Sequence, residues 1–284
     1  MAQRTRRLFA GLATAAGAAL IVKGVLALLE ERRCRLHPLR KPDWDVLRVA
    51  GRAAVAAAVQ RGGVSAELRA EVWPLLLGSQ PDAAAYDALQ RRCDALDAAG
   101  GDADARYSEA RRVIAVDVPR TPLPEPPGSA AHAEAAARLT RLLRAFAVHD
   151  PPVSYCQGMS EIAARFLRVF PDDEASAFAA FAAFVTAQRE SFLADVSQGV
   201  CVRLRRVDAL MARADPAVGA HLRLLRADDC QWLLRPVVVL MLRELPPCDV
   251  ATFFDVLMVR RVATAHCVIL HRSSLGAGDT ATLP

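Results

Sequence analysis

The chain has 284 residues, a formal net charge of +5 and 53% hydrophobic residues. That length suits one large domain or two small ones, and the hydrophobic content is sufficient for a buried core. The charged fraction of 24% argues against disorder along most of the chain. Nearly all the basic residues are arginines, and the chain has no zinc-finger spacing, aromatic RNA-binding strand or long basic run. These features argue against nucleic-acid binding.

Seven cysteines are spread along the chain without a C-x-x-C pair, and six histidines are scattered without i, i+4 pairing. The cysteine pattern fits a reducing compartment with buried thiols. The histidine pattern predicts no metal site. Cys156 lies next to Gln157, and we interpret this cysteine as a packing residue and not as a nucleophile.

Residues 8–29 form an apolar segment with Lys23 as its one charge. Three interpretations stay open: a single membrane anchor, a transit peptide or an amphipathic surface helix. More basic residues follow the segment than precede it, so a membrane span would leave the main domain in the cytosol. We therefore assign residues 1–42 to an anchoring or targeting segment.

The remainder of the chain has helical periodicity and no alternation of strands with helices, which predicts an all-α domain. A proline-rich loop, 117–129, and an irregular tail, 271–284, interrupt or end this pattern. The residue before the predicted helix 174–193, Asp173, is a suitable helix cap. Within 61–78, a glycine turn and the N-cap Ser65 precede a predicted helix that stops at Gly78 and is bent or restarts at Pro74. The other predicted helices are 82–99, 103–116, 133–149, 159–170, 174–193, 199–213, 217–226, 229–245 and 249–262.

Two polar positions near the proline-rich loop suggest phosphate chemistry. Asp117 precedes Arg120 by three residues, and Gln157 follows Arg120 by 37 residues with one predicted amphipathic helix between them. Such a helix can run out and bring the chain back, which would place Arg120 and Gln157 on one surface. The guanidinium fork of arginine suits phosphate oxygens, and a glutamine amide can hold a water molecule through a donor and an acceptor.

An arginine that neutralises charge and a glutamine that orients water are what hydrolysis of a nucleoside triphosphate requires. However, the chain contains no G-x-x-x-x-G-K-[ST] phosphate loop and no Gly-rich kinase loop. We therefore expect a partner to supply the nucleotide and its magnesium ion. That pattern indicates an activator that works in trans.

Three motifs in order resemble the TBC domain of Rab GTPase-activating proteins: RAEVWPLLLG at 69–78, IAVDVPRT at 114–121 and YCQGM at 155–159. Weaker similarity continues through CQWLLRPVVVLMLREL at 230–245 and FFDVL at 253–257. In these segments, Trp232, Arg243-Glu244 and Phe254-Asp255 match later positions of the family. The resemblance covers roughly residues 44–260.

The resemblance implies a two-lobed all-α domain that binds a Rab-family small GTPase in its GTP-bound state and regulates vesicle trafficking. It implies that Arg120 and Gln157 both enter the GTPase site, and that this chain binds no cofactor of its own because GTP and Mg²⁺ belong to the partner. It also implies supporting roles for the residues that shape the two loops, Asp117, Thr121, Tyr155 and Gly158. The implied location is the cytosol or the cytoplasmic face of endomembranes, with membrane contact through residues 8–29.

The last residues depart from the family pattern, because the family continues with further helices where this chain reads VRRVATAHCVIL. We therefore expect a shortened carboxy-terminal lobe, and we place the TBC domain at 43–270 and the tail at 271–284. A second hypothesis remains open, in which the domain is a non-catalytic helical scaffold that binds a GTPase or another partner. We also expect Trp73 and Trp232 to be core residues and Arg243-Glu244 to be an ion pair or a solvated pair.

Overall fold

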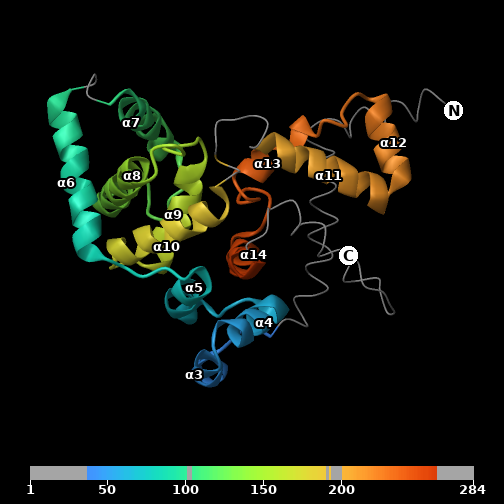
Figure 1. Ribbon diagram of the computed structural model, residues 1–284, viewed down its shortest axis with the longest axis horizontal. Helices are drawn as coiled ribbons and strands as arrows, with labels where there is room; N and C mark the ends of the chain where they lie inside the picture. The colour runs from blue at the N-terminus through green and yellow to red at the C-terminus, as the bar shows by residue number, and fades with distance from the viewer. Residues whose placement is uncertain (1–36, 101–103, 190–191, 193–199, 261–284) are drawn as a thin grey trace.

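The computed structural model describes residues 37–100, 104–189, 192 and 200–260, and its regular structure is helical (Figure 1). Within these residues the β-structure is limited to one isolated bridge, between Leu39 and Val64. The all-α prediction is confirmed. The apolar segment 8–29 and the tail 271–284 lie outside the described residues.

The described elements follow in chain order, with η marking a 3₁₀ turn. They are α3 (Lys41–Ala50), α4 (Arg52–Gly62), η1 (Ala66–Leu68), α5 (Arg69–Leu77), α6 (Ala83–Ala99), α7 (Ala105–Asp117), η2 (Val118–Arg120), α8 (Ala130–His149), α9 (Met159–Val169), α10 (Glu174–Ala187), α11 (Val200–Ala214), α12 (Pro216–Leu224), η4 (Gln231–Leu233), α13 (Leu234–Val238) and α14 (Pro247–Arg260).

Several helices begin where a short polar side chain accepts a hydrogen bond from an otherwise unpaired backbone N–H. Asp173 caps α10 in this way as predicted, by accepting from the N–H of Ser176. Asp82, Asp104 and Ser129 cap α6, α7 and α8 through the same geometry. These caps explain why most predicted helix starts lie within a few residues of the observed ones.

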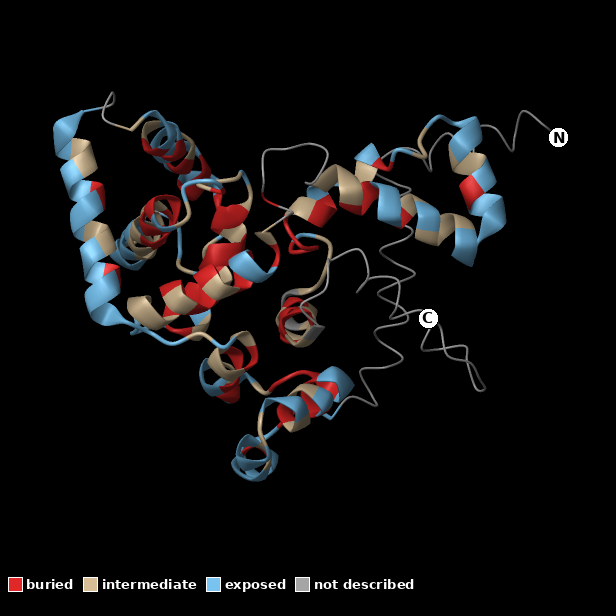
Figure 2. Ribbon diagram, in the orientation of Figure 1, coloured by how far each residue is buried: buried red, intermediate tan, exposed pale blue. Residues whose placement is uncertain are grey.

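The main core lies between α8, α9 and α10 and extends to α5 and α14 (Figure 2). Its largest fully buried side chains are aromatic: Trp73, Phe146, Phe166, Phe181, Phe184 and Phe254. The rings of Trp73 and Phe166 meet edge to face with centroids 5.3 Å apart, a geometry that aromatic pairs prefer. Trp73 is therefore a core residue, as predicted.

A buried carboxylate joins α14 to the amino-terminal elements. Asp255 is fully buried and accepts hydrogen bonds from Trp73 Nε1 at 2.7 Å, from Val64 N at 2.9 Å and from Arg69 Nε at 3.1 Å. A Cβ on Gly63 would lie 3.0 Å from Asp255 Oδ2, so the close approach of α14 requires glycine there. We call Val64, Arg69, Trp73 and Asp255 the Asp255 cluster.

The helices α11, α12 and α13 form a smaller packed region that projects away from the main core (Figure 1, orange). Its own apolar cluster consists of Leu204, Val207, Cys230 and Val237. Trp232 lies beside this region and is only partly buried, so the prediction that it is a core residue is wrong. The described residues thus form two packed regions of unequal size.

Two helix predictions are wrong in extent. The predicted helix 229–245 is instead the short turn η4, the five-residue helix α13 and a turn in which Leu240 and Met241 have φ values of 53° and 59°. The predicted helix 174–193 ends at Ala187. Among the described residues no helix is long and apolar enough to cross a bilayer.

We expect Asp255→Ala to reduce the free energy of unfolding by about 4 kcal/mol, because it leaves the buried donors of Arg69, Trp73 and Val64 without an acceptor. Urea denaturation monitored by circular dichroism measures this change. Glu109→Ala is the matched control, because it removes a carboxylate whose ion pair with Arg112 is exposed, and it should leave the urea midpoint unchanged. Equal midpoints for the two variants would contradict a structural role for the Asp255 cluster.

Candidate functional site

The first candidate loop follows the end of α7. Asp117 is the last residue of α7 and is buried, with 2% of its surface exposed. The 3₁₀ turn η2 then carries Pro119 and Arg120, and Arg120 extends to the surface with 53% of its side chain exposed. Arg120 Nη2 donates to Asp117 Oδ1, so the buried carboxylate orients the exposed guanidinium.

The second candidate loop lies between α8 and α9. The prolines that follow Asp150 stop α8, and Asp150 O accepts from the N–H of Val153 and of Ser154 in the tight turn. Gln157 is exposed in the last turn before α9, and Gly158 stands at the N-cap position of that helix. The amide of Gln157 therefore lies in water at the positive end of a helix dipole.

A set of buried hydrogen bonds ties these two loops together. Tyr155 OH donates to Asp117 Oδ2 at 2.7 Å. Thr121 Oγ1 lies 2.9 Å from the main-chain oxygen of Asp117 and 2.8 Å from Ser160 Oγ. A threonine hydroxyl that donates to the carbonyl can accept from the serine, so one side chain serves both loops. We call Asp117, Arg120, Thr121, Tyr155 and Ser160 the Asp117 cluster.

Burial and the hydrogen bond to Asp117 raise the pKa of the Tyr155 hydroxyl, which therefore stays protonated and acts as a donor. Burial, together with the charge of Asp117, also raises the pKa of the Cys156 thiol. A thiol with a raised pKa is a weak nucleophile at neutral pH. The interpretation of Cys156 as a packing residue agrees with this environment.

Gly158 has a left-handed backbone conformation, with φ at +99°, and it lies close to the segment after α13. A Cβ at this position would stand 3.0 Å from Val239 Cγ1 and 3.3 Å from Val238 Cγ1. Glycine is therefore required at the start of α9 for two reasons, the backbone angle and the contact with Val238 and Val239.

An ion pair extends the second loop toward the same segment. Arg243 Nε lies 2.9 Å from both carboxylate oxygens of Glu161, which stands in the first turn of α9. The prediction that Arg243 pairs with Glu244 or is solvated with it is wrong. Glu244 is instead partly buried, and burial raises its pKa.

The structure thus brings four of the six predicted site residues, Asp117, Arg120, Thr121 and Tyr155, into one hydrogen-bonded cluster. The other two, Gln157 and Gly158, follow Tyr155 directly in the chain. Sequence reasoning missed Ser160 and the pair of Glu161 with Arg243. The available signal for Ser160 was a hydroxyl among the apolar residues of α9, where it is 3% exposed.

We expect Tyr155→Phe to lower the free energy of unfolding by about 2 kcal/mol, because Asp117 Oδ2 loses its donor in a buried site. In an Asp117→Ala background the same substitution should cost much less. A double-mutant cycle by urea denaturation measures the difference. Additive effects would show that the Tyr155–Asp117 hydrogen bond does not join the two loops.

We expect Gly158→Ala to destabilise the domain by more than about 2 kcal/mol, because the added Cβ combines a left-handed backbone angle with steric contact. Gly128→Ala is the matched control, since Gly128 also has positive φ but has no atom within 4 Å of an added Cβ. It should cost about 1 kcal/mol. Comparison of the two urea midpoints tests the contact with Val239, and equal midpoints would argue against it.

A family model described as the Rab-GTPase-TBC domain matches residues 66–275 of the chain. Rab GTPase-activating protein 22 of Arabidopsis thaliana is 37% identical over 110 residues, which are 39% of this chain and 20% of that protein. TBC1 domain family member 25 of Mus musculus is 28% identical over 211 residues, which are 70% of this chain and 28% of that protein. The chain thus spans a minor part of the length of both relatives.

Two solved structures share the fold. The flagellar RabGAP TBC domain of Chlamydomonas superposes with a TM-score of 0.59 at 21% identity, over 91% of this chain and 84% of that one. The Ypt/Rab-GAP domain of Gyp1p gives a TM-score of 0.62 at 18% identity, over 79% of each chain. Together with a family model that covers most of its length, these matches show that the chain belongs to the Rab-GTPase-TBC domain family.

Proposed function

We propose that this chain accelerates GTP hydrolysis by a Rab-family small GTPase in trans, with Arg120 and Gln157 as the two residues that enter the GTPase site. The single observation that carries the proposal is the Asp117 cluster. It holds an exposed arginine at the end of one loop and leads directly to an exposed glutamine in the other. Family membership and the similarity to a Rab GTPase-activating protein of Arabidopsis thaliana support the same activity.

Arg120 stabilises the negative charge that develops on the transferred phosphoryl group. To reach it, the guanidinium exchanges its hydrogen bond to Asp117 for phosphate oxygens. The exposed position of Arg120 allows this rotation, because more than half of the side chain, 53%, is already in contact with solvent. Asp117 keeps the donor Tyr155 throughout, so the loop retains its conformation while the arginine moves.

Gln157 orients the attacking water through its carbonyl oxygen and its amide group. Its place before the first turn of α9 makes the loop stiff, because Met159 N donates to Cys156 O at 3.0 Å across Gln157 and Gly158. A stiff loop matters because hydrolysis depends on the placement of one water molecule.

The partner supplies the nucleotide and Mg²⁺ in this proposal, so the GTP-bound GTPase is the substrate. The proposal extends to regulation of vesicle trafficking at the cytoplasmic face of endomembranes or in the cytosol, with membrane contact through residues 8–29. In the alternative, a helical scaffold binds the GTPase without stimulating it. The exposure of both Arg120 and Gln157 favours the activator.

Single-turnover GTP hydrolysis by a panel of Rab proteins, with and without the full chain, tests the proposal. We expect at least one Rab to be accelerated by a hundredfold or more. Arg120→Ala should abolish the acceleration, because an arginine finger supplies about 10³-fold or more of the rate. Gln157→Ala should reduce it by about 10²-fold, because the water loses its orienting group.

Arg112→Ala is the control variant, since Arg112 is an exposed arginine on the same helix, α7, and is paired with Glu109. It should retain the activity of the unmodified chain. Binding of the same Rab proteins loaded with a non-hydrolysable GTP analogue separates the two hypotheses. Tight binding without acceleration by the well-folded chain would establish the scaffold and reject the activator.

A further inference from the structure

The outer face of α9 carries an arginine that has no partner. The helix packs against α8 and α10 and buries most of its side chains (Figure 1), whereas Glu161, Arg165 and Arg168 lie within an arc of about 60° on its other side. Arg165 is partly buried and Arg168 is exposed. Among the described residues, none forms a hydrogen bond or an ion pair with Arg165.

Glu161 would be the natural partner of Arg165, because residues four apart on a helix lie next to each other. However, both carboxylate oxygens of Glu161 are 2.9 Å from Nε of Arg243, which follows α13. Burial and the like charge of Arg168 lower the pKa of Arg165. In the free domain, Arg165 thus lacks the anion that a partly buried guanidinium requires.

Arg165 also lies close to the candidate site. It stands seven residues after Gly158, which is about 10 Å along the axis of α9, and Arg168 stands about 15 Å along it. A protein interface of standard size covers about 800 Å² on each partner, which is a patch about 30 Å across. A GTPase centred on Gln157 would therefore cover Arg165 and reach Arg168 at the rim of the contact.

We propose that Arg165 determines which GTPases this chain accepts, by forming an ion pair with a carboxylate of the GTPase beside its nucleotide site. The inference rests on the proposed function, because it takes Gln157 as the centre of the contact. The planar fork of the guanidinium matches the two oxygens of a carboxylate, and Asp and Glu are the anionic side chains that a protein surface offers.

The partial burial of Arg165 makes it more selective than Arg168. A GTPase that covers Arg165 without supplying a carboxylate leaves a charge that is buried and unpaired, which disfavours that complex. Arg168 stays in contact with water at the rim, where a charge affects the association rate more than the affinity. Discrimination between GTPases is therefore expected at Arg165.

Titration of the full chain with Rab proteins that carry a non-hydrolysable GTP analogue tests the inference. Arg165→Met removes the charge and keeps an unbranched apolar stem, and it should weaken binding of an accepted Rab by about 30-fold. The maximal rate of GTP hydrolysis at saturation should stay within about twofold of that of the unmodified chain, because Arg165 contributes to binding and not to the chemical step. The urea midpoint of the free chain should not fall, since the variant removes an unpaired charge.

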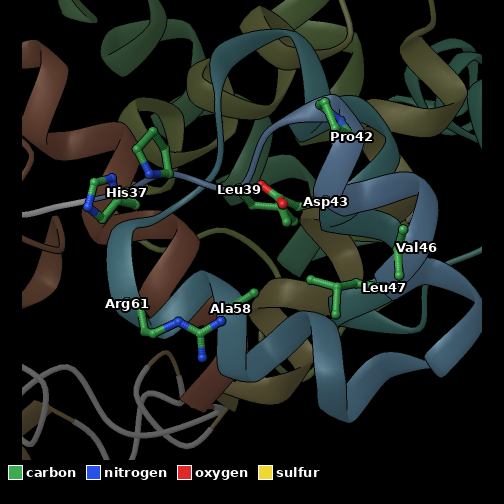
Figure 3. A pocket seen from close by; sticks show the side chains of 9 residues that line it. His37, Leu39, Pro42, Asp43, Val46, Leu47, Ala58 and Arg61 are labelled. Atoms are coloured by element: carbon green, nitrogen blue, oxygen red, sulfur yellow. The ribbon is translucent and has the colours of Figure 1, made fainter.

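Arg61→Met is the matched control. Arg61 is also exposed and without an ion pair among the described residues, but it lines a pocket between α3 and α4, and neither helix belongs to the candidate site (Figure 3). The control changes the net charge by the same amount and should leave binding within about twofold of the unmodified chain.

An exchange of charges identifies the partner group. Arg165→Glu should abolish binding of the accepted Rab. One replacement of Asp or Glu by Arg beside the nucleotide site of that Rab should then restore binding by about tenfold or more. A purely structural effect of Arg165→Glu on α9 would not be rescued by a substitution in the partner.

Four results would overturn the inference. Unchanged Rab binding by Arg165→Met, while Arg120→Ala abolishes the acceleration, would reject it and leave the proposed function standing. Equal weakening by Arg165→Met and Arg61→Met would show a general effect of charge. Loss of binding to phosphatidylserine vesicles with unchanged Rab binding would assign Arg165 to a lipid headgroup. Binding of no Rab by the folded, unmodified chain would reject the proposed function and this inference together.

Discussion

The buried carboxylate of Asp255 is the constraint on which the arrangement of the domain depends. Its charge is removed from water, so it must be matched by donors, and those donors come from the other end of the described chain: Val64, Arg69 and Trp73. A buried carboxylate that lacks some of its hydrogen-bond donors destabilises the fold. If α14 packed at another position, Asp255 would either be exposed to water or lose these donors. One side chain thus fixes how the last described helix meets the first elements.

The same cluster reaches the candidate site through aromatic packing. Trp73 donates to Asp255 on one side and packs against Phe166 of α9 on the other. Phe184 of α10 stacks on Phe254, the neighbour of Asp255, with centroids 5.5 Å apart. The helix α9 begins directly after Gln157 and Gly158. The close-packed core that holds α9 in place therefore also fixes the position of the second loop. The placement of the two candidate loops and the packing of the core are in this way parts of one structure.

Local sequence signals predicted the features that have local causes. Helices with caps such as Asp173 and with periodic apolar residues appear where the pattern indicated, and the motif residues Asp117, Arg120, Thr121 and Tyr155 meet as the folding back of the chain after α8 suggested. The segment 229–245 could not be predicted, because its left-handed residues Leu240 and Met241 and its ion pair from Arg243 to Glu161 depend on contacts with α9. Likewise, the sequence signal for Ser160 is only a hydroxyl among the apolar residues of α9, and its role depends on the contact with Thr121.

The division of one carboxylate between two loops has a consequence for the entropy of association. Asp117 gives one oxygen to Arg120 and the other to Tyr155, so restriction of either loop restricts the group that holds the other. A partner that orders the first loop therefore finds the second already partly ordered, and the loss of conformational freedom on binding is smaller than for two independent loops. In the proposed complex, the domain would meet its partner with one preorganised surface and not with two separate flexible loops.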